Sequence, residues 1–480
     1  MLICAQPDID VYLQYILKSN SRREPLMTRK GIISPDARSA GQSLTPLPGA
    51  RFALILLLVI NLFNYIDRQV LASVVPSIEK EFFPETDESG AKMDPSKREF
   101  VEAKLGSLQT AFMVTYMVIA PIFGWFADRV SRWWLIGVGI ILWSVASGGS
   151  GWAPTFLILL LTRCFVGVGE AAYGPAAPTI ISDLYPVAVR GKVLAWFYAA
   201  IPVGSALGYV LGGLVAKATG DWRWAFYLVL PPGLLLGAWC FFMRDPPRGQ
   251  ADVYENAQNR RPRMRDYFIL IRTPSYVLDT LGMTAMTFAL GGLAFWLPHY
   301  IVKDKKAANL GEVDVVFGII VVVSGLVATL LGGIVGDKLR EHFPGSYFMV
   351  SGFAMLLGFP MVLLVLVTGY PWYWLFIFLA CFCLFFNTGP TNTILANVTH
   401  PAMRSSAFAL NILVIHALGD AASPAIIGVI ASFSSMQIGL VVVSVLILFG
   451  GLLWLWGARY LERDTRLAPT RLTDPRVGDN

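Results

Sequence analysis

The chain has 480 residues, of which 55% are hydrophobic and only 15% are charged, and its formal net charge is +6. A soluble globular protein carries about 25% charged residues. The composition therefore excludes an ordinary water-soluble domain and indicates an integral membrane protein surrounded by membrane lipids. The basic residues form no stripe with interleaved aromatic residues, so no nucleic-acid partner is expected.

The first 50 residues are polar and contain no long apolar run, so we expect residues 1–50 to be a disordered tail. They lack the basic start followed by an apolar core that marks a signal peptide. Met27 precedes a basic tripeptide and is an alternative native start.

Twelve later segments are long and apolar enough to cross a bilayer, which takes about 20 residues per helix. They fall into two groups of six, and this predicts an all-α membrane protein with two six-helix halves, residues 52–243 and 274–460. The predicted spans are 52–78, 105–127, 133–151, 155–181, 191–216, 224–243, 275–302, 313–335, 347–367, 371–398, 405–433 and 437–460.

The linker 244–272 carries seven arginines, and the N-terminal tail is also basic. By the positive-inside rule both segments are cytoplasmic, and an even number of spans in each half makes the two assignments agree. The tail 461–480 is then cytoplasmic as well. We expect a multi-pass protein of the cell (inner) membrane with both termini inside.

The two halves repeat. Residues 124–129 and 333–338 both read G-x-x-x-D-[RK], after the second and the eighth span. A second match pairs Pro186, Gly204 and Gly213 with Pro401, Gly419 and Gly428, each 215 positions later. Duplicated six-span halves resemble the layout of major facilitator transporters.

Four charged residues lie inside the first-half spans: Asp67 and Arg68 in the first, and Arg163 and Glu170 in the fourth. Each costs roughly 2.5–3.5 kcal/mol at mid-bilayer, so they must face one another or water. Asp67 and Arg68 are adjacent and point about 100° apart. We therefore expect Asp67 to meet Arg163 at similar depth.

Arg163, Gly167 and Glu170 share one helix face. Gly167 is expected to leave space for a cavity there, and Gly169 to allow close helix approach. One interpretation is that these charges handle a proton and a substrate, because a carboxylate beside an arginine can exchange its proton when the arginine is captured. The other is that they are structural ion pairs.

The repeated motif predicts a cytoplasmic gate, built from Asp128 and Arg129 in one half and Asp337 and Lys338 in the other. Ordinary helix capping is the alternative. The candidate partners of these side chains in the gate are Arg132, Arg190 and Arg404.

Polar residues in the spans of the second half indicate a function less specifically. His416 in span eleven is either a hydrogen-bonded structural residue or a cavity residue that binds a proton or a headgroup. Asn387, Thr391 and Asn392 in span ten line the cavity or serve packing. Gly204, Gly208 and Gly212 in span five are spaced for close helix packing.

The sequence contains no motif that indicates catalytic chemistry. The sequence has no metal-ligand cluster, P-loop or nucleotide-binding domain, so we expect neither an enzyme nor a cofactor or metal. Four of the five cysteines lie in apolar segments, and we expect all five to be free thiols. They are Cys4, Cys164, Cys240, Cys381 and Cys383.

Several segments resemble the Spinster family of sphingolipid transporters within the major facilitator superfamily. They are residues 64–68, 163–171, 177–180, 198–209, 416–420 and 423–424. The resemblance covers nearly the whole chain after Arg51, and the compact loops suggest a bacterial member. It implies transport of amphipathic lipids such as sphingosine-1-phosphate or lysophospholipids, and roles in substrate or proton handling for Asp67, Arg68, Arg163 and Glu170.

The sequence thus predicts a monomeric secondary transporter that works by alternating access and moves an amphipathic small molecule, with the proton gradient as its energy source. A drug or organic-anion carrier of the same fold is the alternative within transport. A transporter-like membrane sensor is the alternative from another class, although a sensor usually adds a long cytoplasmic domain.

Overall fold

The structure is a computed structural model and describes residues 46–84, 101–252, 262–303, 305 and 310–472. The expected disordered tail, except its last residues, lies outside the described residues, as do Cys4, the loop 85–100, the middle of the linker and the last eight residues. The described part of the chain is helical and contains no strand. Cys164, Cys240, Cys381 and Cys383 are free, as expected.

The N-terminal half contains six spanning units, of which the fourth and fifth are each broken into two helices. The helices are α2 (Ala50–Phe82), α4 (Val101–Ala127), α5 (Arg132–Gly151), α6 (Phe156–Tyr173), α7 (Ala177–Leu184), α8 (Arg190–Tyr198), α9 (Ala200–Thr219) and α10 (Arg223–Cys240).

The C-terminal half repeats this arrangement after two short helices of the linker, η3 (Met264–Tyr267) and α11 (Phe268–Ile271). Its tenth and eleventh spans are broken like the fourth and fifth. The helices are α12 (Pro274–Lys303), α13 (Leu310–Arg340), α14 (Ser346–Val367), α15 (Trp372–Phe385), α16 (Thr388–Val398), α17 (Arg404–Ile415), η5 (His416–Asp420), α18 (Ser423–Phe433) and α19 (Met436–Leu467).

Eleven helical segments of the described residues are long and apolar enough to cross a membrane. They match eleven of the twelve predicted spans. The twelfth is α10, which has only 18 residues, begins with Arg223 and contains Pro231 and Pro232. It packs along α5 and α2 like a spanning helix of the bundle.

One feature of the repeat differs from the sequence match. Arg190 and Arg404 begin α8 and α17 and lie 214 positions apart, whereas Gly204 and Gly419 lie 215 apart. The C-terminal half therefore has one residue more between these two points, and η5 begins within this interval as a π-helix, a turn that holds one residue more than the α-helix.

Glycines let the helices within the N-terminal half approach closely, as the sequence spacing predicts. Added Cβ atoms at Gly204 and Gly208 of α9 would meet backbone oxygens of α2, and one at Gly212 would meet the side chain of Ser73. Gly169 of α6 packs in the same way against Gly139 of α5. The sequence pattern is therefore a packing signal, because small residues allow van der Waals contact between backbones.

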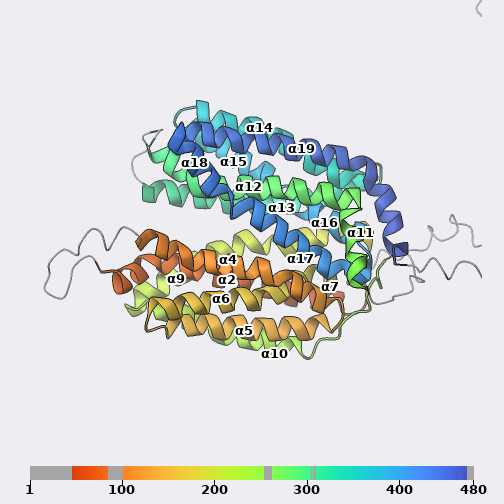
Figure 1. The fold of residues 1–480 in the computed structure, drawn as a ribbon, viewed down its shortest axis with the longest axis horizontal. Helices are drawn as coiled ribbons and strands as arrows, with labels where there is room; N and C mark the ends of the chain where they lie inside the picture. Colours follow the sequence, from red (N-terminus) through yellow and green to blue (C-terminus); the bar gives the residue numbers. More distant parts are fainter. Residues whose placement is uncertain (1–45, 85–100, 253–261, 304, 306–309, 473–480) are drawn as a thin grey trace, which may run out of the picture. The chain divides into compact units, whose positions relative to one another are not determined.

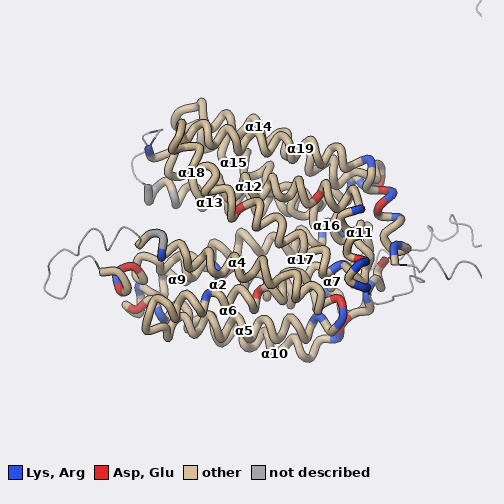
Figure 2. Tube along the Cα trace, in the orientation of Figure 1, with Lys and Arg blue, Asp and Glu red and all other residues tan. Residues whose placement is uncertain are grey.

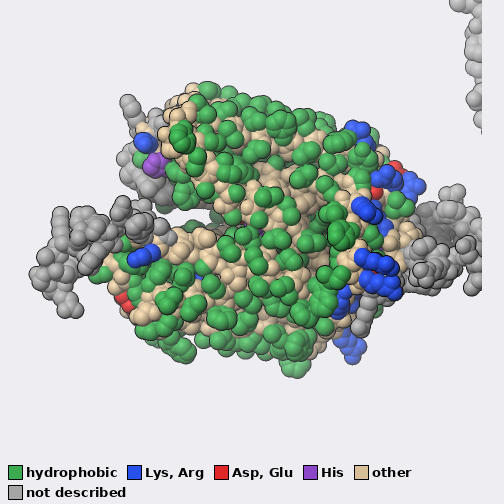
Figure 3. Space-filling model, in the orientation of Figure 1, with side chains coloured by type: hydrophobic (Ala, Val, Ile, Leu, Met, Phe, Trp, Pro, Cys, Tyr) green, Lys and Arg blue, Asp and Glu red, His purple; other side chains and the backbone are tan. Residues whose placement is uncertain are grey.

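The two halves lie side by side, with the orange and yellow helices in one and the green and blue helices in the other (Figure 1). Contact between them runs along α4 with α17 and along α8 with α13 and α16. Charged residues gather at the helix ends, and few lie between (Figure 2). On the face shown in Figure 3, hydrophobic side chains form a belt between the charged ends, as expected where helices face lipid rather than water.

We expect Gly208→Ala to destabilise the protein by about 1–3 kcal/mol, the usual range for overpacking, because the new methyl group would collide with the carbonyl of Ile66 on α2. Thermal unfolding of purified protein in detergent measures this. Gly213→Ala on the same helix is the control, since nothing lies within 4 Å of its added Cβ. Equal effects of the two substitutions would contradict the packing assignment.

Candidate functional site: a buried charge cluster and an interdomain lock

The four charged residues of the first and fourth spans lie in one buried cluster between α2, α4, α5 and α6. Arg68 donates to Glu170 at 2.6 Å. Asp67 accepts a hydrogen bond from the hydroxyl group of Ser147 on α5. Arg163, Glu170 and Asp67 are all at most 1% exposed.

Asp67 and Arg163 attract each other electrostatically, as expected for two charges at similar depth, but they form no hydrogen bond or ion pair within the described residues. Because neighbouring helical residues point in different directions, Arg68 turns to α6 and Asp67 turns to α5. Arg163 instead lies toward the ring of Phe112 on α4, with 5.9 Å between its guanidinium carbon and the ring centroid.

Gly167 does not clear room for a cavity, which is a second correction. An added Cβ there would lie 2.5 Å from the carbonyl oxygen of Phe112, so the space beside Gly167 is filled by the backbone of α4. Arg163 and Glu170 are buried in this arrangement, and their exposure to a central cavity stays a prediction.

Several polar atoms of the cluster have no hydrogen-bond partner. Within the described residues, one oxygen of Asp67, one oxygen of Glu170 and all three guanidinium nitrogens of Arg163 have no hydrogen-bond partner. Buried polar groups are normally paired, and an unpaired one costs about 1–3 kcal/mol or more. These groups are therefore suited to accept a further ligand, a proton or water.

Aromatic rings enclose the one charged group of the cluster that is partly exposed. The guanidinium carbon of Arg68 lies 4.9 Å from the ring centroids of Tyr65 and Phe112 and 5.0 Å from that of Tyr116. Such contacts stabilise a cation through the quadrupole of the ring. The cage leaves the Arg68 side chain 13% exposed, compared with 0% for Glu170.

A second charge pair lies opposite, in the C-terminal half. His416 and Asp420 are one turn apart in η5, and His416 Nδ1 is 3.0 Å from the Asp420 carboxylate. The ring of Tyr116 stands edge-on to His416 at 5.7 Å between centroids, so this tyrosine lies between Arg68 and the histidine. The sequence analysis did not select Asp420, although its i+4 spacing from a histidine within an apolar helix was the available signal.

Asn387 and Thr391 are not brought to the cluster. Thr391 donates to the carbonyl oxygen of Asn387 at 2.9 Å, and both residues are buried. The Asn387 amide has no hydrogen-bond partner among the described residues. Asn392 donates to the Thr388 carbonyl within its own helix.

At the linker end, Asp128 joins the halves. One carboxylate oxygen accepts from the Ser405 amide at 3.0 Å, and the other accepts from the amide and hydroxyl of Ser406 at 3.2 and 2.5 Å. These donors stand at the N-terminus of α17, where the helix dipole favours a negative charge. Asp128 therefore caps a helix of the opposite half.

Asp337 makes the equivalent contact in the other direction. It accepts from the Lys192 amide at the start of α8 at 2.7 Å and from the Tyr347 hydroxyl at 2.7 Å. An added Cβ at Gly191 would collide with the Asp337 carboxylate, so a larger residue there would displace that carboxylate from its place beside α8. The repeat seen in the sequence is thus a reciprocal pair of helix-end contacts.

The predicted gate arginines bind two aspartates that the sequence analysis missed, Asp183 on α7 and Asp252 in the linker. Arg132 and Arg404 donate to Asp183 at 2.5 and 2.8 Å. Arg190 and Arg404 donate to Asp252 at 2.8 and 2.7 Å. Burial alone would raise the pKa of Asp252, but the guanidinium groups of Arg404 and Arg190 outweigh it and hold this pKa below its ordinary value.

Arg129 and Lys338 hold matching positions in the repeated motif, but only Arg129 takes part in the contacts at the linker end. Arg129 donates to the hydroxyl of Tyr267 at 3.0 Å and to the carbonyl of Pro262 at 2.7 Å, so it joins the N-terminal half to the linker. Lys338 is exposed and makes no hydrogen bond or ion pair within the described residues. Arg340, half a turn further along α13, instead donates to the Val187 carbonyl of the other half at 2.9 Å.

The structure is closed at the linker end and not at the other. Among the described residues, the hydrogen bonds between the halves all lie at the linker end. We call these contacts the lock, together with the adjoining bonds that the arginines make to Asp183 and to the linker. It comprises Asp128, Arg129, Arg132, Asp183, Arg190, Asp252, Asp337, Arg340 and Arg404 with their partners. At the opposite end the surface is hollowed between the halves (Figure 3).

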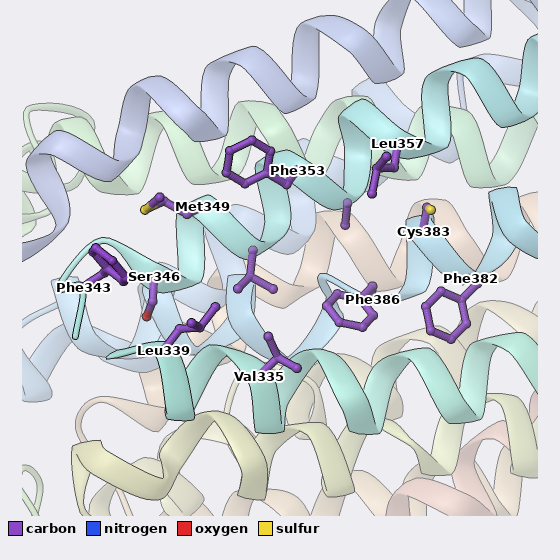
Figure 4. A pocket seen from close by; sticks show the side chains of 12 residues that line it. Val335, Leu339, Phe343, Ser346, Met349, Phe353, Leu357, Phe382, Cys383 and Phe386 are labelled. Carbon is purple, nitrogen blue, oxygen red and sulfur yellow. The ribbon is translucent and has the colours of Figure 1, made fainter. Parts of the chain in front are cut away.

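A groove of about 410 Å³ on the C-terminal half is a poor candidate for the substrate site. It lies between α13, α14 and α15 and is lined by apolar side chains such as Leu339, Phe353 and Phe386 (Figure 4). Phe353 is 52% exposed and faces the membrane. None of the charged residues described above lines it.

Comparison with known proteins identifies the family. Residues 57–424 match the model of the Major Facilitator Superfamily. The chain is 34% identical to protein spinster homolog 3 of Danio rerio, covering 93% of this chain and 94% of that protein. It is 36% identical to protein spinster homolog 1 of Homo sapiens, covering 89% and 84%. The chain belongs to the Spinster family of major facilitator transporters.

Solved structures agree with this fold. A bacterial homolog of the human lysosomal transporter Spinster, in an inward-facing and occupied conformation, matches with a TM-score of 0.58 at 20% identity, over 88% of this chain and 99% of that one. The proton:xylose symporter XylE matches with a TM-score of 0.70 at 14% identity, over 87% and 98%. These solved structures show the major facilitator fold, and the family match together with the apolar helices makes the chain a multi-pass membrane transporter.

The Arg68–Glu170 pair gives a test of the cluster. Arg68→Gln leaves a buried carboxylate without its cation, and we expect a loss of about 3–5 kcal/mol of stability, the usual cost of breaking a buried ion pair from one side. Arg68→Gln combined with Glu170→Gln should recover much of it. Thermal unfolding of the single and double variants measures the difference, and additive losses would show that the two groups do not interact.

The lock can be tested at Asp128. Asp128→Asn keeps the size of the side chain but offers one acceptor oxygen to three donors. The closed state should lose about 1.5–3 kcal/mol, the range for hydrogen bonds to a charged group. Spin-label distances across the linker end should then show a larger open population. Lys338→Gln, in the matching motif but outside the lock, is the control, and an unchanged distribution for Asp128→Asn would reduce this residue to a helix-end anchor.

Proposed function

We propose that this protein is a proton-coupled secondary transporter that carries an amphipathic, lipid-like molecule through the membrane by alternating access. The observation that carries the proposal is the buried cluster on α2 and α6, in which Arg68 is paired with Glu170 while Asp67 and Arg163 keep unused hydrogen-bonding atoms. Such groups are expensive in a membrane protein and are retained where a substrate or an ion passes.

The lock supports alternating access. Those of its contacts that join the two halves, such as Asp128 with Ser405 and Asp337 with Lys192, can exist only while the linker end is closed. The other end is hollow in this structure (Figure 3). Opening the linker end requires the hydrogen bonds between the halves to break, including those of Asp128, Asp337 and Arg404. A ligand shifts such an equilibrium only by binding one state better than the other. The charge cluster lies between the two ends, where both states can reach it.

Proton coupling follows from competition for Arg68. An anionic group of the substrate can take the guanidinium from Glu170, whose carboxylate is then left buried without its cation. A proton can replace the lost guanidinium, since a desolvated carboxylate without a counter-charge favours its neutral form. Asp67 already has one unpaired oxygen and serves as a second acceptor. Substrate binding and proton uptake are thereby linked.

An amphipathic substrate fits the chemistry around Arg68. The guanidinium offers a charge to a headgroup, and the rings of Tyr65, Phe112 and Tyr116 offer apolar surface around it. His416 and Asp420 face the same space from the other half. A sphingolipid or lysophospholipid combines a charged headgroup with an alkyl chain, in keeping with the family. We place both termini and the linker on the cytoplasmic side and expect a monomer.

Transport into proteoliposomes tests the proposal. Saturable uptake of a fluorescent lysophospholipid, driven by an imposed pH gradient and showing counterflow, is the expected result. Equal uptake of a short organic anion that lacks an alkyl chain would favour the organic-anion carrier. Binding without any flux would favour a sensor.

Asp67→Asn should abolish the dependence of transport on the pH gradient while substrate counterflow continues, because the amide keeps the shape of the side chain but cannot carry the proton. The measurement is uptake with and without an imposed gradient. Asp464→Asn is the matched control, since Asp464 is also a buried carboxylate but lies in α19, outside the cluster, and already accepts from the Ser275 amide and from Arg471. Gradient-driven uptake that persists in Asp67→Asn would remove this residue from the coupling mechanism.

A further inference from the structure

A large apolar groove at the linker end has no place in the transport cycle described so far. Its volume is about 750 Å³, within the 300–1,000 Å³ typical of ligand sites. One wall is α4 of the N-terminal half, the opposite wall is α17 of the C-terminal half, and η3 and α11 of the linker lie along it. It is lined by Pro121, Ile122, Trp125, Phe126, Met264, Tyr267, Phe268, Ile271, Ser406 and Leu410.

The groove faces the membrane. Phe268, Ile271 and Met264 are between 62% and 70% exposed, and Ile122 and Phe126 continue the same apolar surface along α4. Large exposed side chains of this kind on a linker would be costly in water, but they suit the edge of a bilayer. An acyl chain is the occupant that matches an apolar groove open to lipid.

Basic side chains border the groove where the linker crosses it. Arg263 and Arg265 flank the lining residue Met264, and Arg272 follows Ile271; all three are exposed. Lys and Arg side chains gather at this end, next to the hydrophobic belt (Figure 3). Asp266 is the acidic residue among them, and it is buried and accepts from the Arg263 amide.

Arg129 adds a fourth positive charge beneath the groove. Its guanidinium carbon lies 4.0 Å from the ring centroid of the lining residue Trp125, and its hydrogen bonds go to neutral oxygens of Trp125, Pro262 and Tyr267. Within the described residues, it makes no ion pair with a carboxylate. The border therefore carries a surplus of positive charge, which at a membrane edge attracts anionic headgroups.

The groove is joined to the lock by two of its lining residues. The amide and hydroxyl of Ser406 donate to Asp128, and the Tyr267 hydroxyl lies 3.5 Å from the same carboxylate. Because its walls belong to opposite halves, the groove has this shape only while α4 and α17 are together. A molecule bound in it has less to contact once the linker end opens.

We propose that this groove binds an anionic phospholipid of the leaflet at the linker end, with an acyl chain along α4 and α17 and the headgroup phosphate among Arg263, Arg265 and Arg272. The lipid binds the arrangement with the closed lock better than the open one, and by linkage it raises the closed population. The protein is thus regulated by the charge of the surrounding membrane, separately from its transported substrate.

Photo-cross-linking in nanodiscs tests the binding site. Phosphatidylglycerol with a photoactivatable acyl chain should label residues 121–126 or 264–271, as mapped by mass spectrometry, several-fold more strongly than phosphatidylcholine carrying the same chain. Arg263→Gln combined with Arg265→Gln should remove that preference. Arg459→Gln combined with Arg466→Gln, on the same end of the protein but on α19, is the charge-matched control and should keep it.

Equal labelling by the two lipids, or an equal loss in the control, would show only general attraction to the membrane and overturn the site. The regulatory step has its own readout, the spin-label distance across the linker end in nanodiscs with and without phosphatidylglycerol. The closed population should rise several-fold with the anionic lipid in the unsubstituted protein and the control, and stay unchanged in Arg263→Gln/Arg265→Gln. A lipid-independent distribution in the unsubstituted protein would overturn regulation.

Discussion

A charge buried in a protein that is itself surrounded by lipid is costly unless it is bonded to another group, and this constraint organises the molecule. Asp183, Arg132, Arg190 and Arg404 are almost wholly buried, and each finds its partners across a helix or domain boundary. Removing one such partner leaves an uncompensated charge, which is far more costly than losing a surface ion pair. The closed linker end is therefore a cooperative state rather than a sum of weak contacts.

The two charge systems of the protein satisfy this constraint to different degrees. The carboxylates of the lock are saturated: both oxygens of Asp128 accept hydrogen bonds from the opposite half, and both oxygens of Asp183 accept as well. The cluster around Arg68 is not, since Asp67, Glu170 and Arg163 keep unused atoms. A saturated network holds one arrangement, and an unsaturated one can take up a ligand or a proton. This division suits a carrier with a switch at one end and a binding site between the ends.

The pseudo-symmetry of the halves extends to the switch but not to the binding site. Asp128 reaches the start of α17 and Asp337 reaches the start of α8, so each half caps a helix of the other. The ion-pair cluster has no such twin, because the second half offers a histidine and an aspartate on a π-helix instead. The lock is therefore symmetric between the halves, whereas the charge cluster proposed as the substrate and proton site is not.

Much of the fold was readable from the sequence. Apolar run length predicts the spans, because a bilayer fixes how many residues a helix needs to cross it, and the spacing of Gly204, Gly208 and Gly212 predicts a close helix contact. The repeated motif also placed Asp128 and Asp337 at matching helix ends. Of the predicted spans, only α10 is absent from the helices that are long and apolar enough to cross a membrane; it has 18 residues, begins at Arg223 and contains two prolines.

Which charged residues form ion pairs with one another was decided by the tertiary structure. The sequence predicts that four charged residues of spans one and four lie within the membrane, with Asp67 and Arg163 at similar depths. The rotation of α2 and the packing of Gly167 against α4 then make Arg68 the partner of Glu170. Likewise, nothing in the local sequence marks Asp183 and Asp252 as the acceptors of three arginines, since they come from different segments. Membrane insertion depends on composition along one helix, which the sequence records directly, whereas an ion pair depends on the relative rotation of several helices, which only their packing determines.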